Sequence, residues 1–125
     1  MKNKILTILS AIMGLLFLNG GLNKFLNYMP VPEDLNPELV KDFQALVEIS
    51  WLIPLIAVAE IIAGLLLIFP RTRALGVLII FPVAVGILLT HIVVDPSQLM
   101  LPLSIWAILI WNIYDHREKF LAIIK

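Results

Sequence analysis

The sequence contains no cysteine, which excludes disulfide bonds, dithiol redox chemistry and thiolate metal sites within this chain. Charged residues are scarce, at 14% of 125 residues, against about 25% in soluble domains. The nine basic and nine acidic residues cancel, so net charge does not indicate a nucleic-acid partner. A Gly-rich phosphate loop, a His-Glu-x-x-His zinc pair and a nucleophile elbow are also missing. No motif therefore predicts an enzyme, and the chain would at most be a subunit of a membrane oxidoreductase.

Hydrophobic residues, by contrast, make up 61% of the chain, and its mean hydropathy is +1.01. They fall into four long apolar runs, and a helix needs about 20 apolar residues to cross a bilayer. We predict an all-α fold, a single domain over residues 1–125 built as an integral membrane four-helix bundle. The predicted spans are about 5–28, 51–69, 74–94 and 98–114. Lys2 and Lys4 before the first run also resemble a signal peptide, but no small-x-small cleavage site follows.

The distribution of Lys and Arg predicts the orientation, because cytoplasmic loops carry an excess of both. If the spans alternate, most basic residues fall on one side, together with both termini: Lys2, Lys4, Arg71, Arg73, Arg117, Lys119 and Lys125. We therefore predict a multi-pass protein of the inner (plasma) membrane with both termini in the cytoplasm. On this topology the two histidines, His91 and His116, lie on opposite sides, and we expect no metal site.

The long first loop is predicted to face outward and to contain a helix over residues 36–49. Asn36, Pro37 and Glu38 have the pattern of an N-cap, a first-turn proline and a first-turn acid. Apolar residues then recur at helical spacing on one face, which indicates an amphipathic helix that lies across the outer end of the bundle or in the membrane interface. The sequence leaves open whether this helix is a connector or a lid over an outward-facing cavity.

Glu60 lies in the middle of the second apolar run, Trp51 to Phe69. A carboxylate at that depth costs roughly 2.5–3.5 kcal/mol on insertion scales, so it normally faces protein or a water-filled cavity and has a partner. Asn19, Asn23 and Lys24 are expected at matching depth in the first span, and Asn27 is expected to continue the asparagine row. Ala57 and Gly64 share the face of Glu60, and small residues let membrane helices approach closely. We predict that Glu60 points into the bundle, within reach of Asn19, Asn23 or Lys24.

Further polar and aromatic residues are predicted in the outer half of the bundle. They suggest a polar pocket with these candidate residues: Asn19, Asn23, Lys24, Trp51, Glu60, His91 and Ser104. Each residue also has a structural interpretation. Glu60 could fix helix rotation, Lys24 could reach to the interface instead of pairing, and the asparagines could hold helices together.

Several segments resemble the DoxX-like family of small bacterial four-helix membrane proteins. The first is the segment 19–25, with the sequence NGGLNKF, at the end of the first helix. The others are Glu60 followed by Gly64 and three leucines, a short turn with Arg71 and Arg73, and an apolar helix ending near His91. The resemblance implies the four-helix fold. For activity it implies only a range: thiosulfate:quinone oxidoreduction, oxidative-stress complexes, and cargo or assembly roles. Some members of the DoxX-like family use cysteine chemistry, and this chain, which has no cysteine, does not fit that role.

Three functions remain open from the sequence. The first is a binding or accessory subunit that holds a lipid- or quinone-like ligand in the outer pocket, beside a redox partner. No cofactor is certain, and quinone and lipid are the candidates. The second is a structural or assembly protein without a ligand, and the third is a small dimeric transporter. Membrane lipids are expected partners in every case, and a homo-oligomer or an oxidoreductase partner is compatible with the first and third.

Overall fold

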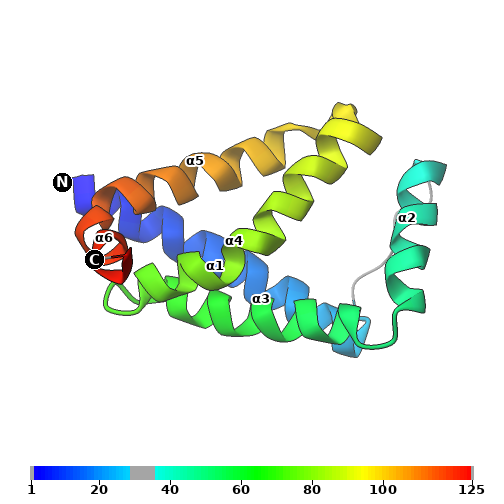
Figure 1. The fold of residues 1–125 in the computed structure, drawn as a ribbon, viewed down its shortest axis with the longest axis horizontal. Helices are drawn as coiled ribbons and strands as arrows, with labels where there is room; N and C mark the ends of the chain where they lie inside the picture. The colour runs from blue at the N-terminus through cyan, green and yellow to red at the C-terminus, as the bar shows by residue number, and fades with distance from the viewer. Residues whose placement is uncertain (1, 29–35, 125) are drawn as a thin grey trace.

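The computed structural model describes residues 2–28 and 36–124, and every regular element among them is helical, which confirms the predicted all-α class (Figure 1). The elements in chain order are α1 (Lys2–Leu26), α2 (Pro37–Glu48), α3 (Leu52–Ile68), α4 (Arg73–Leu89), the π-helix η1 (Thr90–Val94), the 3₁₀ turn η2 (Pro96–Gln98), α5 (Met100–Asp115) and α6 (Arg117–Ile124). The short helix α6 was not predicted from the sequence.

The prediction of four membrane spans is confirmed only in part. Within the described residues two helical stretches are long and apolar enough to cross a membrane, Lys4–Leu26 and Arg73–Val94. A third is added if α2 and α3 count as one broken span. By themselves α3 and α5 have 17 and 16 residues, which is about 25 Å of helix against a hydrocarbon core of about 30 Å. Proline-containing turns at Pro70 and Pro96 limit their length, so a regular four-span bundle is not established.

Helix α1 ends two residues earlier than predicted, at Leu26. Asn27 follows with a φ of 52°, in the left-handed region. Asparagine tolerates this conformation better than most residues and commonly ends helices there. The predicted row of three asparagines on one helical face is therefore wrong at its third member, because Asn27 has left the helix.

Helices α1 and α3 run antiparallel and touch through their backbones. A Cβ atom built on Gly14 would lie 2.5 Å from the Gly64 carbonyl oxygen, and one built on Gly64 would lie 2.5 Å from that of Gly14. Seven residues further along α1, a Cβ on Gly21 would lie 2.6 Å from the Ala57 carbonyl oxygen. Only glycine permits this approach, so the small residues predicted on the Glu60 face do form the helix contact.

Helices α4 and α5 add the rest of the core. Trp106 of α5 donates its indole N–H to the Ala84 carbonyl of α4 over 3.1 Å, and its ring meets Phe81 edge-on. The buried core draws on α1, α3, α4 and α5: Met13, Phe17, Ala63, Leu67, Val77, Ile80, Ala84, Ile105 and Leu109. Gly86 of α4, in contrast to Gly14 and Gly64, has no atom within 4 Å of a built Cβ and makes no close helix contact.

The two ends of the molecule differ in what they carry (Figure 1). One end, here called the termini end, contains the start of α1, the helix α6 and the turn between α3 and α4. Helix α2 lies at the opposite end, here called the α2 end. Between them many large apolar side chains are exposed, including Ile8 of α1 at 59% and Leu55 of α3 at 56%. Such exposure is expected of helices surrounded by lipid.

Candidate functional site

The candidate site is an ion pair between α1 and α3. The Lys24 Nζ atom lies 2.5 Å from Glu60 Oε1. The Glu60 side chain is 6% exposed, and the Lys24 side chain is 25% exposed. The ammonium and the carboxylate are therefore in direct contact, and the carboxylate is almost fully removed from solvent. The prediction that Glu60 faces the interior within reach of Lys24 is confirmed.

The sequence of α3 explains why Glu60 points inward. Its buried residues recur every three or four positions: Ala57, Glu60, Ala63, Gly64 and Leu67. Because the neighbours of Glu60 on this face are small, α1 comes close enough for Lys24 to reach the carboxylate. A Cβ built on Gly20 would lie 3.2 Å from Glu60 Oε2, so the missing side chain at position 20 leaves room for the carboxylate.

Removing two charges from water is costly, and the cost is offset only when the charges pair closely. Each partner therefore depends on the other: Glu60 alone would be a buried anion, and Lys24 alone would turn toward the surface. The pair consequently fixes the rotation of α1 against α3 and the register between them.

The asparagines of the candidate pocket lie on α1 and both are engaged. The Tyr28 hydroxyl donates to the Asn19 backbone carbonyl over 3.1 Å and also contacts Asn19 Oδ1. Asn23 is half-buried one residue before Lys24, and it too has an interaction partner. The Tyr28 hydroxyl thus folds back onto α1.

The remaining three candidates bind their own helices or face outward. Ser104 is exposed, and its hydroxyl donates to the Met100 carbonyl over 2.8 Å. His91 is half-buried, with Nδ1 2.7 Å from the Ile87 carbonyl oxygen. Trp51 is 62% exposed. Each contact is local, so the arrangement brings Lys24 and Glu60 together, and the use of the other residues as a ligand pocket stays a prediction.

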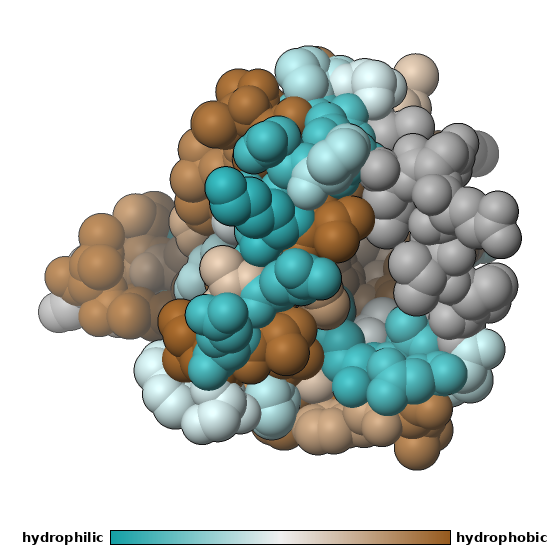
Figure 2. All heavy atoms as spheres, turned by 90° about the vertical axis from the view of Figure 1, so that its right-hand side faces the viewer, coloured by the Kyte–Doolittle hydropathy of each residue, from teal (hydrophilic) through white to brown (hydrophobic). Residues whose placement is uncertain are grey.

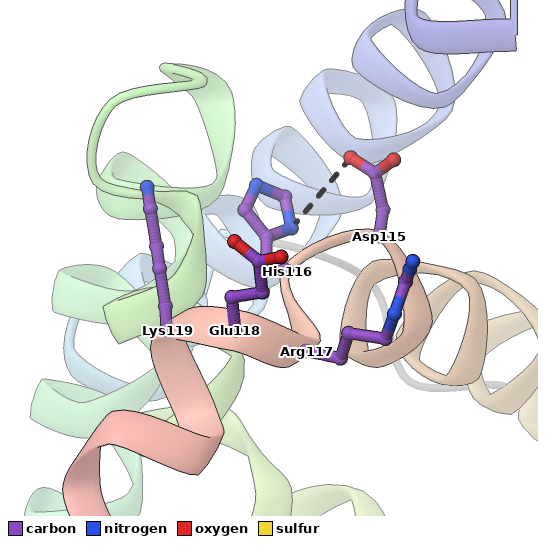
Figure 3. Close-up of a pocket in the computed structure, with 5 residues that line it drawn as sticks. All are labelled: Asp115, His116, Arg117, Glu118 and Lys119. Carbon is purple, nitrogen blue, oxygen red and sulfur yellow. Dashed lines mark ion pairs between the residues drawn. The ribbon is translucent and has the colours of Figure 1, made fainter.

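A hollow of about 290 Å³ is found at the termini end instead (Figure 3). Five consecutive residues of the α5–α6 turn line it: Asp115, His116, Arg117, Glu118 and Lys119. Two acids face two bases there, and His116 Nδ1 lies 3.9 Å from Asp115 Oδ2. One chain segment makes up the lining, and its two acids balance the Arg117 and Lys119 charges, so the lining does not favour a ligand of one charge sign.

A second polar contact, which the sequence did not predict, joins α1 to α5 nearer the termini end. Asn112 donates to the Ser10 hydroxyl over 3.0 Å, and both residues are fully buried. Asn112 also donates to the Ile108 carbonyl over 3.0 Å. Asn112 is a polar residue in an apolar segment, which is a weak signal of such a contact, but a single serine in a helix gives no comparable signal.

Arg73 is likewise buried, against the expectation that it lies in an exposed cytoplasmic turn. Its Nε donates to the Leu67 carbonyl over 3.4 Å, and the neighbouring Thr72 hydroxyl donates to the Leu66 carbonyl over 2.8 Å. These two carbonyls belong to the last turn of α3, where helix carbonyls lack intrahelical partners. Buried polar groups thus occur at the termini end as well as at the Lys24–Glu60 pair.

The chemical capacity of these groups is limited. The chain has no thiol, and the described residues contain no group of three or more His, Asp or Glu placed to hold a metal ion. The site can hold charge and orient helices.

Comparison with known proteins identifies one family. The family model described as Methylamine utilisation protein MauE matches residues 2–95. This stretch runs from α1 through η1, and it includes both Lys24 and Glu60. Neither the curated proteins nor the solved structures give a significant match.

This match corrects the resemblance to the DoxX-like family, which is wrong. The segments on which it was based, around residues 19–25 and 60–67, lie inside the region that matches MauE. They are short and mostly apolar, with a glycine contact and an acid between two membrane helices. Physical requirements of helix packing produce such patterns in unrelated membrane families.

Proposed function

We propose, given that the chain belongs to the MauE family, that it is an accessory membrane protein in methylamine utilisation which works by holding its helices, and through them a partner, in a fixed arrangement. The observation that carries the proposal is the family match over residues 2–95, with the Lys24–Glu60 ion pair inside the matched region. The matched helices contain neither a thiol nor a catalytic motif. A chain of this kind supports a pathway by assembly or positioning, and partner proteins supply the chemistry.

The geometry favours an assembly role over ligand binding. The Glu60 carboxylate, the strongest candidate for binding a ligand, is already paired with Lys24. The Ser104 and His91 side chains bind carbonyls of their own helices. The narrower hypothesis of a lipid or quinone in a polar pocket therefore has little support.

We also propose that the termini end faces the cytoplasm of a cell whose inner membrane holds the protein. Five described basic residues lie toward that end: Lys4, Arg71, Arg73, Arg117 and Lys119. Helix α2 carries three acids and one base. The positive-inside tendency supports this orientation. The test is a single cysteine at position 45 and a thiol reagent that does not cross the membrane. The cysteine should react when the reagent reaches the outer face of the inner membrane, and reaction only from the cytoplasmic face would contradict the orientation.

The function is tested by growth. A strain that lacks the gene, supplied with the wild-type chain, should grow on methylamine as its nitrogen source, whereas the unsupplied strain should not. Growth on ammonium should be equal in both strains, since the proposed role is specific to methylamine. Gly86→Ala serves as the matched neutral variant, because a Cβ there meets open space. Unimpaired growth of the deletion strain on methylamine would overturn the proposal.

A further inference from the structure

Helix α2 has an apolar face that the described residues of the chain leave unburied. Leu39, Val40, Phe43, Leu46 and Val47 recur at intervals of three and four residues, which places them on one side of the helix. No residue of α2 is buried, and Phe43 and Val47 are 50% and 52% exposed. A row of half-exposed apolar side chains on one face requires a covering medium other than the rest of this chain.

The direction of α2 indicates which medium that is. Helices α2 and α3 meet at a bend of 97° across the short break between Glu48 and Leu52. Because α3 runs along the long axis with the membrane-crossing helices, α2 runs across it, in the plane of the bilayer (Figure 1). Viewed from the α2 end, hydrophilic residues form a strip that faces the viewer, over hydrophobic atoms (Figure 2). The polar side of α2 therefore faces away from the membrane-embedded helices.

Attachments at both ends hold α2 in this position. At its start, Asn36 Oδ1 accepts the Glu38 N–H over 2.9 Å, and Asn36 Nδ2 donates to the Val94 carbonyl over 3.3 Å. At its end, the Leu52 N–H donates to the Ile49 carbonyl over 3.0 Å, which joins α2 closely to α3. The helix is thus fixed at the level where the long helices end, while its middle has no buried contact.

We propose that α2 is a membrane-interface helix whose apolar face, made of the five residues above, lies on the acyl chains of the leaflet at the α2 end. An amphipathic helix parallel to a bilayer buries its apolar side at the boundary between headgroups and acyl chains. Its three acids, Glu38, Asp42 and Glu48, outnumber Lys41, which gives it a charge of −2 and makes neutral or zwitterionic lipids the matching surface. The headgroup region, not a folded protein lid, then covers the α2 end of the Lys24–Glu60 pair.

The position of α2 can be tested by spin labelling at introduced cysteines, because the chain has no native cysteine that would react. Single cysteines at 43 and 47 on the apolar face, and at 45 on the polar face, are spin-labelled in nanodiscs of phosphatidylcholine. Accessibility to oxygen, which concentrates in acyl chains, is compared with accessibility to a water-soluble nickel complex. The ratio of oxygen to nickel accessibility should be several-fold higher at 43 and 47 than at 45. A label at Ile62, exposed on α3, provides the lipid reference.

Two outcomes would overturn the proposal. Equal nickel accessibility at 47 and 45 would place α2 in water, away from the bilayer. Protection of 43 and 47 from both reagents would show that protein, such as a second copy of the chain, covers the face. Val47→Cys is a small change at an exposed position, so it retains a test even if Phe43→Cys disturbs folding.

A second arm varies lipid charge. Replacing part of the phosphatidylcholine with phosphatidylglycerol should lower the oxygen-to-nickel ratio at 47 and leave that at 62 unchanged, because only α2 is repelled. A ratio at 47 that rises with anionic lipid would contradict the charge argument. Neither arm involves methylamine, so this inference and the proposed function can fail separately.

Discussion

The contact between α1 and α3 and the contact between α4 and α5 are built in different ways. In the first, the backbones of Gly14 and Gly64 touch, and a charged pair joins Lys24 to Glu60. In the second, side chains mediate the contact: the Trp106 indole donates to the Ala84 carbonyl and meets the Phe81 ring edge-on. The first contact is intolerant of added volume and depends on charge balance, whereas the second should adjust to changes of a few atoms. The rigid element of the fold is thus the pair α1–α3, which lies wholly inside the region matched by the family.

The largest effect is expected from filling the α1–α3 contact. Gly64→Leu places a side chain where even a Cβ would come within 2.5 Å of the Gly14 carbonyl oxygen, so the helices must separate. Overpacking typically costs about 1–3 kcal/mol, and with rigid backbone on the other side we expect at least the upper value. Gly86→Leu is the control, since nothing lies within 4 Å of its Cβ. Thermal unfolding in detergent measures both, and equal midpoints would show that the close contact is not needed.

Next in size is the removal of one member of the ion pair. Lys24→Met leaves the Glu60 carboxylate buried without a counter-charge, which we expect to cost about 3 kcal/mol. Adding Glu60→Leu to the same chain should restore most of that loss, because the buried charge is gone. Glu60→Gln alone should cost less than Lys24→Met, since Lys24 is partly exposed and can reach the surface. Denaturant or thermal unfolding of the wild type and these three variants measures each loss of stability, and a double variant as unstable as Lys24→Met would argue against charge burial.

A smaller effect is expected where α1 meets α5. Asn112→Ala removes the buried bond to Ser10, which should cost about 1 kcal/mol. Ser104→Ala provides the comparison, because that hydroxyl is exposed and binds only its own helix. Unfolding midpoints compare the two, and an equal or larger shift for Ser104→Ala would reverse the assignment of the structural contact.

The smallest effect should come from the α4–α5 contact. Trp106→Phe keeps the aromatic ring against Phe81 and loses the hydrogen bond to Ala84, for an expected cost of about 0.5–1 kcal/mol. Trp51→Phe, at a position 62% exposed, should be close to neutral. Thermal unfolding in detergent measures both variants. If Trp106→Phe lowered the stability as much as Gly64→Leu does, the distinction between the two helix contacts would be lost.

The elements that the sequence predicted well are those with a strong local signal. Helix α2 matches its prediction within one residue at each end, since Asn36 caps it and Pro37 begins it. Glu60 was expected inside because a lone acid in an apolar run has few alternatives. Lys24 was one of three partners expected at matching depth, and the structure selects it.

What the sequence could not predict depends on packing between distant segments. The bond between Ser10 and Asn112 joins residues 102 positions apart. Gly86 and Gly64 look alike in sequence, yet one faces open space and the other faces α1. The family was misassigned for a related reason: short apolar segments with glycine and one acid reflect membrane packing in general. The family match, by contrast, extends over residues 2–95.

The central claim is that the Lys24–Glu60 pair holds α1 against α3 and that this arrangement supports methylamine utilisation. Exchanging the charges tests it most directly. Lys24→Glu and Glu60→Lys are each introduced alone and then together in the gene-deletion strain, with the amount of protein in the membrane measured alongside growth on methylamine. The account predicts that each single variant lowers both quantities, since two like charges then face each other, and that the exchanged pair recovers them. Growth on methylamine that is normal in both single variants, or no better in the exchanged pair than in either single variant, would contradict it.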